Sequence, residues 1–212
     1  MNDETIDRHR SVATRGDYGS MARLARALYE TGLEPREVLE RCYGVDFPNE
    51  LFSIVEAGRR ALGLLLVYTN QPWELAIPPD QGGPRPEPHV LDAVERKIFA
   101  RDSDLVPLGL ILDSHSRWVG SVLCYRLAEL SARRPTVFGI KEEVTPDDQV
   151  VRCGESLLEV MRVHHVDVLE GLEREWRHPS NFGAGSVDLE ELAEVRSLVE
   201  RIEELQRSLA SR

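Results

Sequence analysis

The sequence predicts an α+β fold in which helices flank a mainly antiparallel sheet of four to six strands, with a C-terminal helical hairpin. Short apolar runs at 105–112, 120–127 and 135–140 are separated by polar turn residues, as in neighbouring strands of one sheet. Elsewhere, apolar residues recur in steps of three and four, which is typical of helices. With 212 residues and 42% hydrophobic content, the chain can build one substantial core.

The net charge of −11 disfavours a nucleic-acid partner, because clustered Lys and Arg carry most of the affinity for phosphates. An acidic surface suits a basic protein partner, and it also serves solubility. Cys42, Cys124 and Cys153 are odd in number and far apart, which argues against disulfides and a zinc site. We expect no cofactor.

The first ten residues lack the apolar core of a signal peptide, and about 18 consecutive apolar residues occur nowhere. We therefore expect a cytoplasmic protein without membrane contact. Residues 1–18 are polar, and we expect them to be loosely docked. Ser20 is a candidate cap for a first helix that ends before Gly32.

A second helix is expected from Pro35 to Tyr43, since proline is tolerated in a first helical turn. Phe47 precedes a proline, which predicts an extended anchor followed by another helix. Residues 62–69 and 73–77 suggest a hairpin around a turn at 70–72, although the first of these runs could equally extend the helix.

Residues 78–88 are rich in proline and glycine and predict an exposed loop, after which a helix over 90–100 leads to the central strands. A long amphipathic helix is expected over 155–176, and a linker over 177–187 separates it from a last amphipathic helix over 188–212. We thus expect one α+β domain over residues 19–176, followed by the linker and that helix.

The last helix carries an apolar stripe that could pack on the preceding helix of the same chain or pair between two copies as a homodimer. Its members are Val195, Leu198, Ile202, Leu205 and Leu209.

Residues 39–52, which include Tyr43-Gly44-Val45-Asp46-Phe47-Pro48-Asn49-Glu50, resemble the opening of SUKH-superfamily domains. In that family a helix, a glycine-containing turn and an apolar-Pro-acidic step lead into an aromatic-bearing helix. The runs at 105–109, 120–127 and 134–139 and the helix around 156–158 resemble the remaining strands and the closing helix in order and approximate spacing. The resemblance covers about residues 22–165, and the Asp-Gly-rich turn usual between the central strands is replaced by residues 113–118.

The resemblance implies a protein-binding module without enzyme activity. Bacterial SUKH proteins are typically immunity proteins that neutralise cognate toxins, often nucleases, and an acidic domain suits a basic nuclease. We expect contacts through the sheet face, loop 78–88 and loop 113–118, with Trp118 as an exposed aromatic anchor. The candidate partner-binding residues are Asp113, His115, Arg117, Trp118, Glu142 and Glu143.

Two alternatives remain beside the immunity hypothesis. One is a self-associating scaffold or regulatory protein that uses the C-terminal stripe. The other is a hydrolase that uses Asp113 and His115, although triad members usually meet through the fold and not through adjacency in sequence. His164 and His165 point about 100° apart on a helix and are unsuited to grip one metal ion together. Cys124, in mid-strand, is expected to be a buried thiol.

Overall fold

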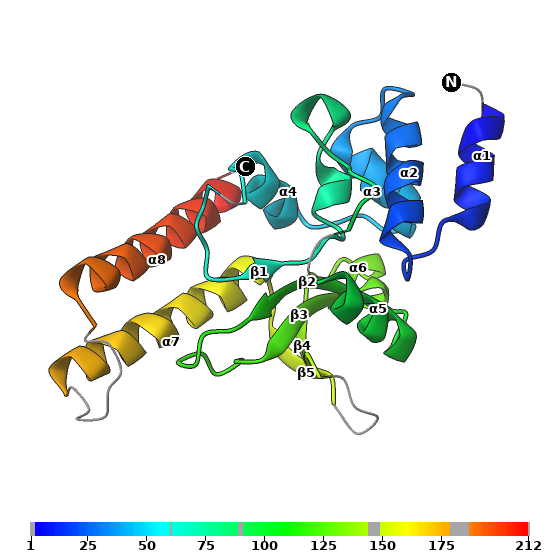
Figure 1. The fold of residues 1–212 in the computed structure, drawn as a ribbon. Coiled ribbons are helices and arrows are strands. Elements are labelled where there is room, and N and C mark those ends of the chain that lie inside the picture. The colour runs from blue at the N-terminus through cyan, green and yellow to red at the C-terminus, as the bar shows by residue number, and fades with distance from the viewer. Residues whose placement is uncertain (1–2, 60, 89–90, 144–148, 179–186, 212) are drawn as a thin grey trace.

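The computed structural model describes residues 3–59, 61–88, 91–143, 149–178 and 187–211. Within them, eight α-helices surround a five-stranded antiparallel sheet, so the predicted α+β class is confirmed (Figure 1). The last two helices run side by side away from the sheet, as the predicted C-terminal hairpin requires (Figure 1).

The sheet is a meander in which each strand pairs with the next along the chain. The three central strands match the three predicted apolar runs, and they are fully or largely buried. The two-residue strand at one edge lies within the predicted strand 62–69, whereas the four-residue strand at the other edge was not predicted. The strands are β1 Val67–Tyr68, β2 Leu105–Ile111, β3 Ser121–Arg126, β4 Val137–Lys141 and β5 Val151–Gly154.

Both faces of the central strands are covered. One face joins the main core, which includes side chains from α2 (Tyr18–Tyr29), α3 (Pro35–Tyr43), α4 (Asn49–Glu56) and α7 (Leu157–Arg177). Leu110, Val122 and Cys124 lie in the cluster on the other face, against α5 (Asp92–Arg101). The predicted burial of Cys124 is confirmed, and the sheet face over β2 and β3 is not open to a partner.

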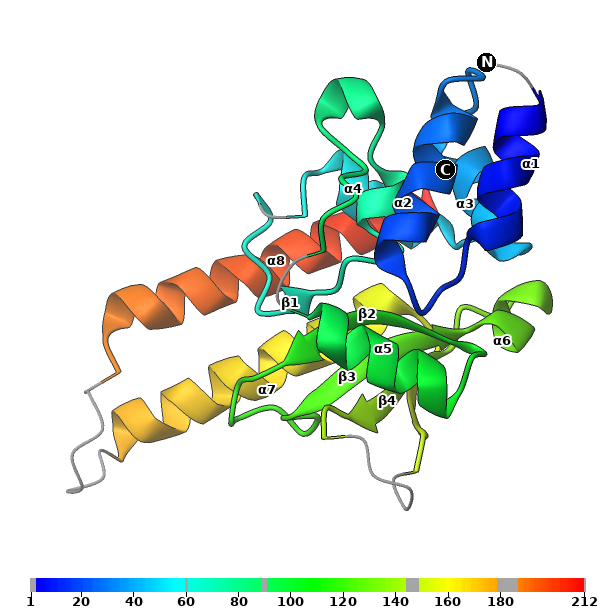
Figure 2. The same ribbon diagram turned by 45° about the vertical axis from the view of Figure 1, so that its right-hand side comes forward.

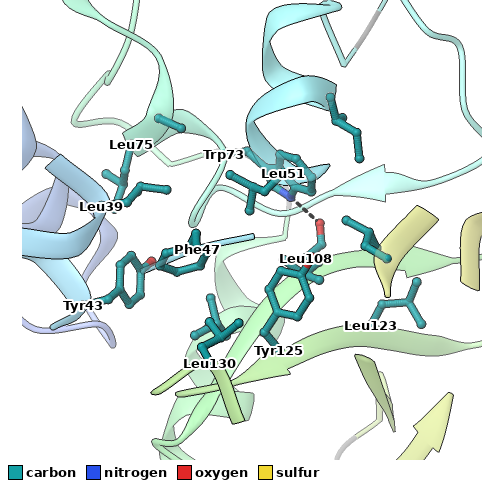
Figure 3. Packing of buried hydrophobic residues seen from close by; sticks show 14 of the residues in the cluster. Leu39, Tyr43, Phe47, Leu51, Trp73, Leu75, Leu108, Leu123, Tyr125 and Leu130 are labelled. Atoms are coloured by element: carbon teal, nitrogen blue, oxygen red, sulfur yellow. Dashed lines mark hydrogen bonds between the residues drawn. The ribbon is translucent and has the colours of Figure 1, made fainter. Parts of the chain in front are cut away.

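Trp73 lies at the centre of the main core (Figure 3). Its indole Nε1–H donates a 2.6 Å hydrogen bond to the carbonyl oxygen of Leu108, which satisfies the buried polar end of the ring. The predicted hairpin over 62–69 and 73–77 is wrong. Residues 74–76 form a 3₁₀ turn that buries Trp73 and Leu75 in the core. The strand β1 pairs with β2 instead.

The N-terminal segment is also more ordered than its polarity suggests. Residues 3–12 form α1 (Asp3–Val12), which lies against α2 and buries Ile6. The expectation of loose docking over residues 1–18 is therefore wrong for the described part. Ser20 lies inside α2, which begins at Tyr18, and its hydroxyl accepts a hydrogen bond from the N–H of Thr14 instead of capping the helix.

The next helices confirm the prediction. α3 begins at Pro35 and ends before Gly44, which has a left-handed φ of 75°. Phe47 is an extended, buried residue before α4. A 3₁₀ turn over Pro79–Gln81 interrupts the predicted loop 78–88. Helix α5 follows the expected range closely, although Val90 lies outside the described residues.

The C-terminal hairpin consists of α7 and α8 (Leu189–Ala210), while the short α6 (Leu127–Ser131) follows β3. Val195, Leu198 and Ile202 are buried within the same chain, so the apolar stripe is used for intramolecular docking. Most of the predicted linker 177–187 lies outside the described residues. In the described ranges, none of the helices combines the length and the apolar character needed to cross a membrane.

Candidate binding site at the loop between β2 and β3

The loop between β2 and β3 is built from local hydrogen bonds. The Asp113 carboxylate accepts a 2.8 Å hydrogen bond from the backbone N–H of His115, and the Ser116 hydroxyl accepts one of 3.2 Å from the N–H of Trp118. Short polar side chains that bond the backbone two residues on favour turns over strand. Gly120, at a left-handed φ of 68°, returns the chain to β3. The sequence thus forms a compact loop by itself.

His115 joins this loop to α7. Its Nδ1 lies 3.0 Å from an Asp113 carboxylate oxygen, and its Nε2 lies 3.0 Å from a Glu175 carboxylate oxygen. Partial burial lowers the pKa of His115, but the hydrogen bonds that its ring makes to the Glu175 and Asp113 carboxylates outweigh it and raise the pKa above its ordinary value. The imidazolium is therefore favoured between two carboxylates.

Gly171 provides the space for this contact. A Cβ atom at residue 171 would lie 2.2 Å from Cδ2 of the His115 ring, a separation that real side chains do not reach. The ring therefore packs directly on the backbone of α7. Glycine inside a helix lowers stability by about 1 kcal/mol relative to alanine. The close approach of the His115 ring explains why a glycine occupies this position.

Arg117 makes a second bridge to the same helix. Its Nε and Nη2 each lie 2.7 Å from a different oxygen of Asp167, and its backbone N–H donates to that carboxylate as well. Burial alone would raise the pKa of Asp167, but the hydrogen bonds from Arg117 lower it below its ordinary value. A two-pronged pair of this kind fixes orientation as well as distance.

The α7 partners Asp167, Gly171 and Glu175 were missed from the sequence. They recur every four residues, so they lie along one face of a helix. The alternation of a carboxylate, a glycine and a carboxylate along that face was a usable signal for a docked polar loop.

The structure brings most of the predicted binding residues together. Glu142 follows β4 and donates its backbone N–H to the carbonyl of Gly120, which places it at the base of the loop. Glu143 is exposed next to it. Trp118 is not the exposed anchor that the sequence suggested, because its ring is partly buried and packs against the main core. The Arg117 guanidinium lies 5.7 Å from the centre of that ring.

Other apolar side chains are exposed at this site instead. Leu112 is 60% exposed and Val119 is 39% exposed at the two ends of the loop. Trp176, one residue beyond the Glu175 that binds His115, is 49% exposed. We call the loop 113–118, its flanking residues Leu112 and Val119, and Trp176, next to the Glu175 anchor on α7, the loop surface. Exposed apolar side chains rimmed by charge are common at protein interfaces.

The His115 ring is held from both sides. Both of its ring nitrogens are engaged by carboxylates, and no hydroxyl or thiol of a described residue bonds to the ring. Within the described ranges, no group of three or more His, Cys, Asp or Glu side chains is placed to hold a metal ion.

His164 and His165 are both fully buried and hold the backbone of Leu65. His164 Nε2 lies 2.8 Å from the Leu65 carbonyl oxygen, and His165 Nε2 accepts a 2.9 Å hydrogen bond from the Leu65 N–H. His165 Nδ1 lies 2.7 Å from the carbonyl of Met161, so it is the nitrogen that carries the proton. The pair thus ties α7 to the segment that leads into β1.

No family model matches this chain, no curated protein matches its sequence, and no solved structure matches its fold.

Proposed function

We propose that this chain is a protein-binding module that neutralises a bacterial toxin, acting as an immunity protein through the loop surface. The observation that carries the proposal is the double attachment of the β2–β3 loop to α7, through His115 with Glu175 and Arg117 with Asp167. A loop that is already fixed in the free protein loses little conformational entropy on binding.

The exposed apolar side chains supply contact area. Leu112 and Val119 flank a loop whose own polar groups are bonded to α7, and Trp176 is exposed beside Glu175, where that loop is attached. Aromatic and aliphatic side chains on a rigid frame are frequent hot spots of protein interfaces.

The charge around this surface supports a basic partner. Glu142, Glu143, Glu170 and Glu175 add negative charge around the loop, in a chain of net charge −11. Opposite potentials accelerate encounter and help to reject wrong partners. A nuclease toxin fits this description, because its substrate site is basic.

The order of elements supports the SUKH-like part of the proposal. A helix that ends at Gly44, the extended Phe47, helix α4, an antiparallel sheet and the closing helix α7 follow each other as the sequence resemblance implies. The helix α8 is an addition to that plan.

Co-expression with the product of the adjacent gene tests the proposal. Bacteria that carry that gene alone should stop growing, and this chain should restore growth and co-purify with the product at a fixed ratio. Absence of both rescue and complex would overturn the proposal. The double variant Leu112→Asp/Val119→Asp should fail to rescue, whereas Val12→Asp, which changes a residue 57% exposed on α1, should rescue fully.

A further inference from the structure

A second surface feature has the opposite charge to the rest of the chain. A cleft of about 620 Å³ lies where the end of α1, the connection to α2, the end of α3 and the end of α5 meet. Figure 2 shows the connection between α1 and α2 reaching down towards α5. The cleft lining includes four arginines, and the described lining residues include no carboxylate. The arginines are Arg10, Arg15, Arg41 and Arg96.

Two of these arginines have carboxylate partners outside the cleft. Arg10 pairs with Asp7 at 3.2 Å, and Arg96 pairs with Asp92 at 3.0 Å. For Arg15 and Arg41 the structure gives no salt bridge to any described residue.

Arg15 provides further evidence for an anion site. Its Nη1 is shielded from solvent and has no hydrogen-bond partner among the described residues. A buried guanidinium nitrogen without an acceptor costs free energy. Arg15 is also one of the residues that line the cleft, so its guanidinium is available to an anion there.

The rest of the lining is uncharged and in part apolar, with Thr14 and Ser103 as its polar side chains. Met21, Leu24 and Phe99 line the cleft beside the arginines. Burial raises the pKa of Cys42, another lining residue, to about 12, so its thiol adds no negative charge at neutral pH. A ligand here would meet cations on one side and hydrocarbon on the other.

We propose that this cleft binds a small phosphorylated molecule, with its phosphate on Arg15 and Arg41 and its apolar or aromatic part against Met21, Leu24 and Phe99. Planar guanidinium groups match phosphate oxygens in pairs, which an ammonium or a hydroxyl cannot do. Two arginines without carboxylate partners balance the double charge of a phosphate. The cleft volume lies in the range of small-molecule sites.

Calorimetric titration of the full chain with inorganic pyrophosphate, ADP and adenosine tests this proposal. Pyrophosphate and ADP should bind, ADP more tightly, and adenosine should not bind measurably. Arg41→Gln should weaken ADP binding about tenfold, because one charge-assisted contact is lost. Arg15→Gln/Arg41→Gln should weaken it further. Arg26→Gln, the same change at an exposed position of α2 outside the cleft, should leave affinity unchanged.

Absence of pyrophosphate and ADP binding at millimolar concentration would overturn the proposal, as would equal loss in the Arg41 and Arg26 variants. Equal affinity for ADP and pyrophosphate would overturn the role of the apolar wall. Because Arg41 is exposed, its single variant retains the fold and decides the test even if the double variant does not fold. The titration contains no protein partner, so its result is independent of the proposed immunity function.

Discussion

His165 accepts a hydrogen bond from the backbone N–H of Leu65, 100 residues earlier in the chain, and it can do so only while its Nε2 is unprotonated. Nδ1 of the same ring faces the Met161 carbonyl and carries the proton. A second proton would place two N–H groups against each other inside the core. The contact that ties α7 to the segment before β1 therefore depends on a neutral imidazole.

This arrangement makes stability sensitive to acid. Burial, aided by the neighbouring His164, lowers the pKa of His165 from 6.5 to about 4. Between these values His165 binds more protons in the unfolded chain than in the folded chain, so its contribution to folded stability falls as the pH falls from 6.5 to 4. Because a difference of one in pKa corresponds to about 1.4 kcal/mol, the loss of unfolding free energy from this residue is about 3 kcal/mol.

Chemical denaturation of the wild type and of His165→Gln at pH 7 and pH 4 measures that loss. The glutamine variant is neutral at both values, so the difference in unfolding free energy should change by about 3 kcal/mol in favour of the variant at pH 4. A difference that is the same at both pH values would contradict the assigned protonation state.

Glu95 produces the opposite dependence. Its carboxylate accepts hydrogen bonds from the backbone and side chain of Asn70, but burial dominates and raises its pKa from 4.5 to about 7. Here the folded chain binds more protons than the unfolded chain, so stability falls as the pH rises from 4.5 to 7. Glu95→Gln should therefore gain up to about 3 kcal/mol relative to wild type between pH 4.5 and 8.

Denaturation of the two proteins across that range checks the expectation. A variant that gains nothing above pH 7 would show that the carboxylate is ionised at little cost. Because the Glu95 and His165 contributions have opposite signs, they offset each other in the wild type between pH 4.5 and 6.5, and each single variant should expose the slope of the other residue.

Glu50 is buried where α4, β3 and α7 meet. It accepts hydrogen bonds from the Tyr125 hydroxyl at 2.8 Å and from the backbone N–H groups of Leu157 and Leu158 at 2.8 and 3.1 Å. These amides begin α7, where a negative charge is favourable. Glu50→Ala leaves three buried donors without an acceptor, which should cost about 3 to 5 kcal/mol.

Tyr125→Phe is the matched control, because it removes one of these hydrogen bonds and should cost about 1 kcal/mol. Equal losses of unfolding free energy in the two variants would show that the bonds to α7 contribute nothing.

Gly171 controls the docking of the loop on α7. In Gly171→Ala the new methyl group would displace His115, so the bond to Glu175 should break. Hydrogen exchange of the amides in 113–118 should accelerate about tenfold, equivalent to roughly 1.4 kcal/mol of local stability. Arg174→Ala, at an exposed position of the same helix outside these contacts, should leave exchange unchanged. Unaltered protection in both variants would mean that His115 does not anchor the loop.

The elements predicted correctly are those whose local sequence pattern matches their environment in the fold. The runs that became β2, β3 and β4 are apolar and largely buried, and Pro35 with Gly44 marks the ends of α3. The hairpin over 62–77 was mispredicted because a short apolar run does not show which strand it will pair with, and β1 pairs with β2. Leu66 packs where Gly109 leaves room, since a Cβ at 109 would lie 2.6 Å from the Leu66 side chain.

Only the loop residues of the candidate site could be predicted from the sequence, and their partners on α7 could not. Asp113, His115 and Arg117 stand out in a short polar loop, but the carboxylates that hold His115 and Arg117 on α7 lie 60 and 50 residues later. A local sequence pattern does not show which residues 50 or 60 positions apart come into contact in the fold. The exposure of Trp118 was misjudged for the same reason, because the core surface that covers its ring is assembled from distant segments.

Binding of a basic toxin by the loop surface is tested most directly by the affinity of the purified chain for the product of the adjacent gene, compared between Leu112→Asp/Val119→Asp and Val12→Asp. We expect tight binding by wild type and Val12→Asp, and a loss of at least about 100-fold in the double variant, because two interface anchors would be replaced by buried charges. Equal affinity of all three proteins, or no binding by wild type, would contradict the proposed role of the loop surface.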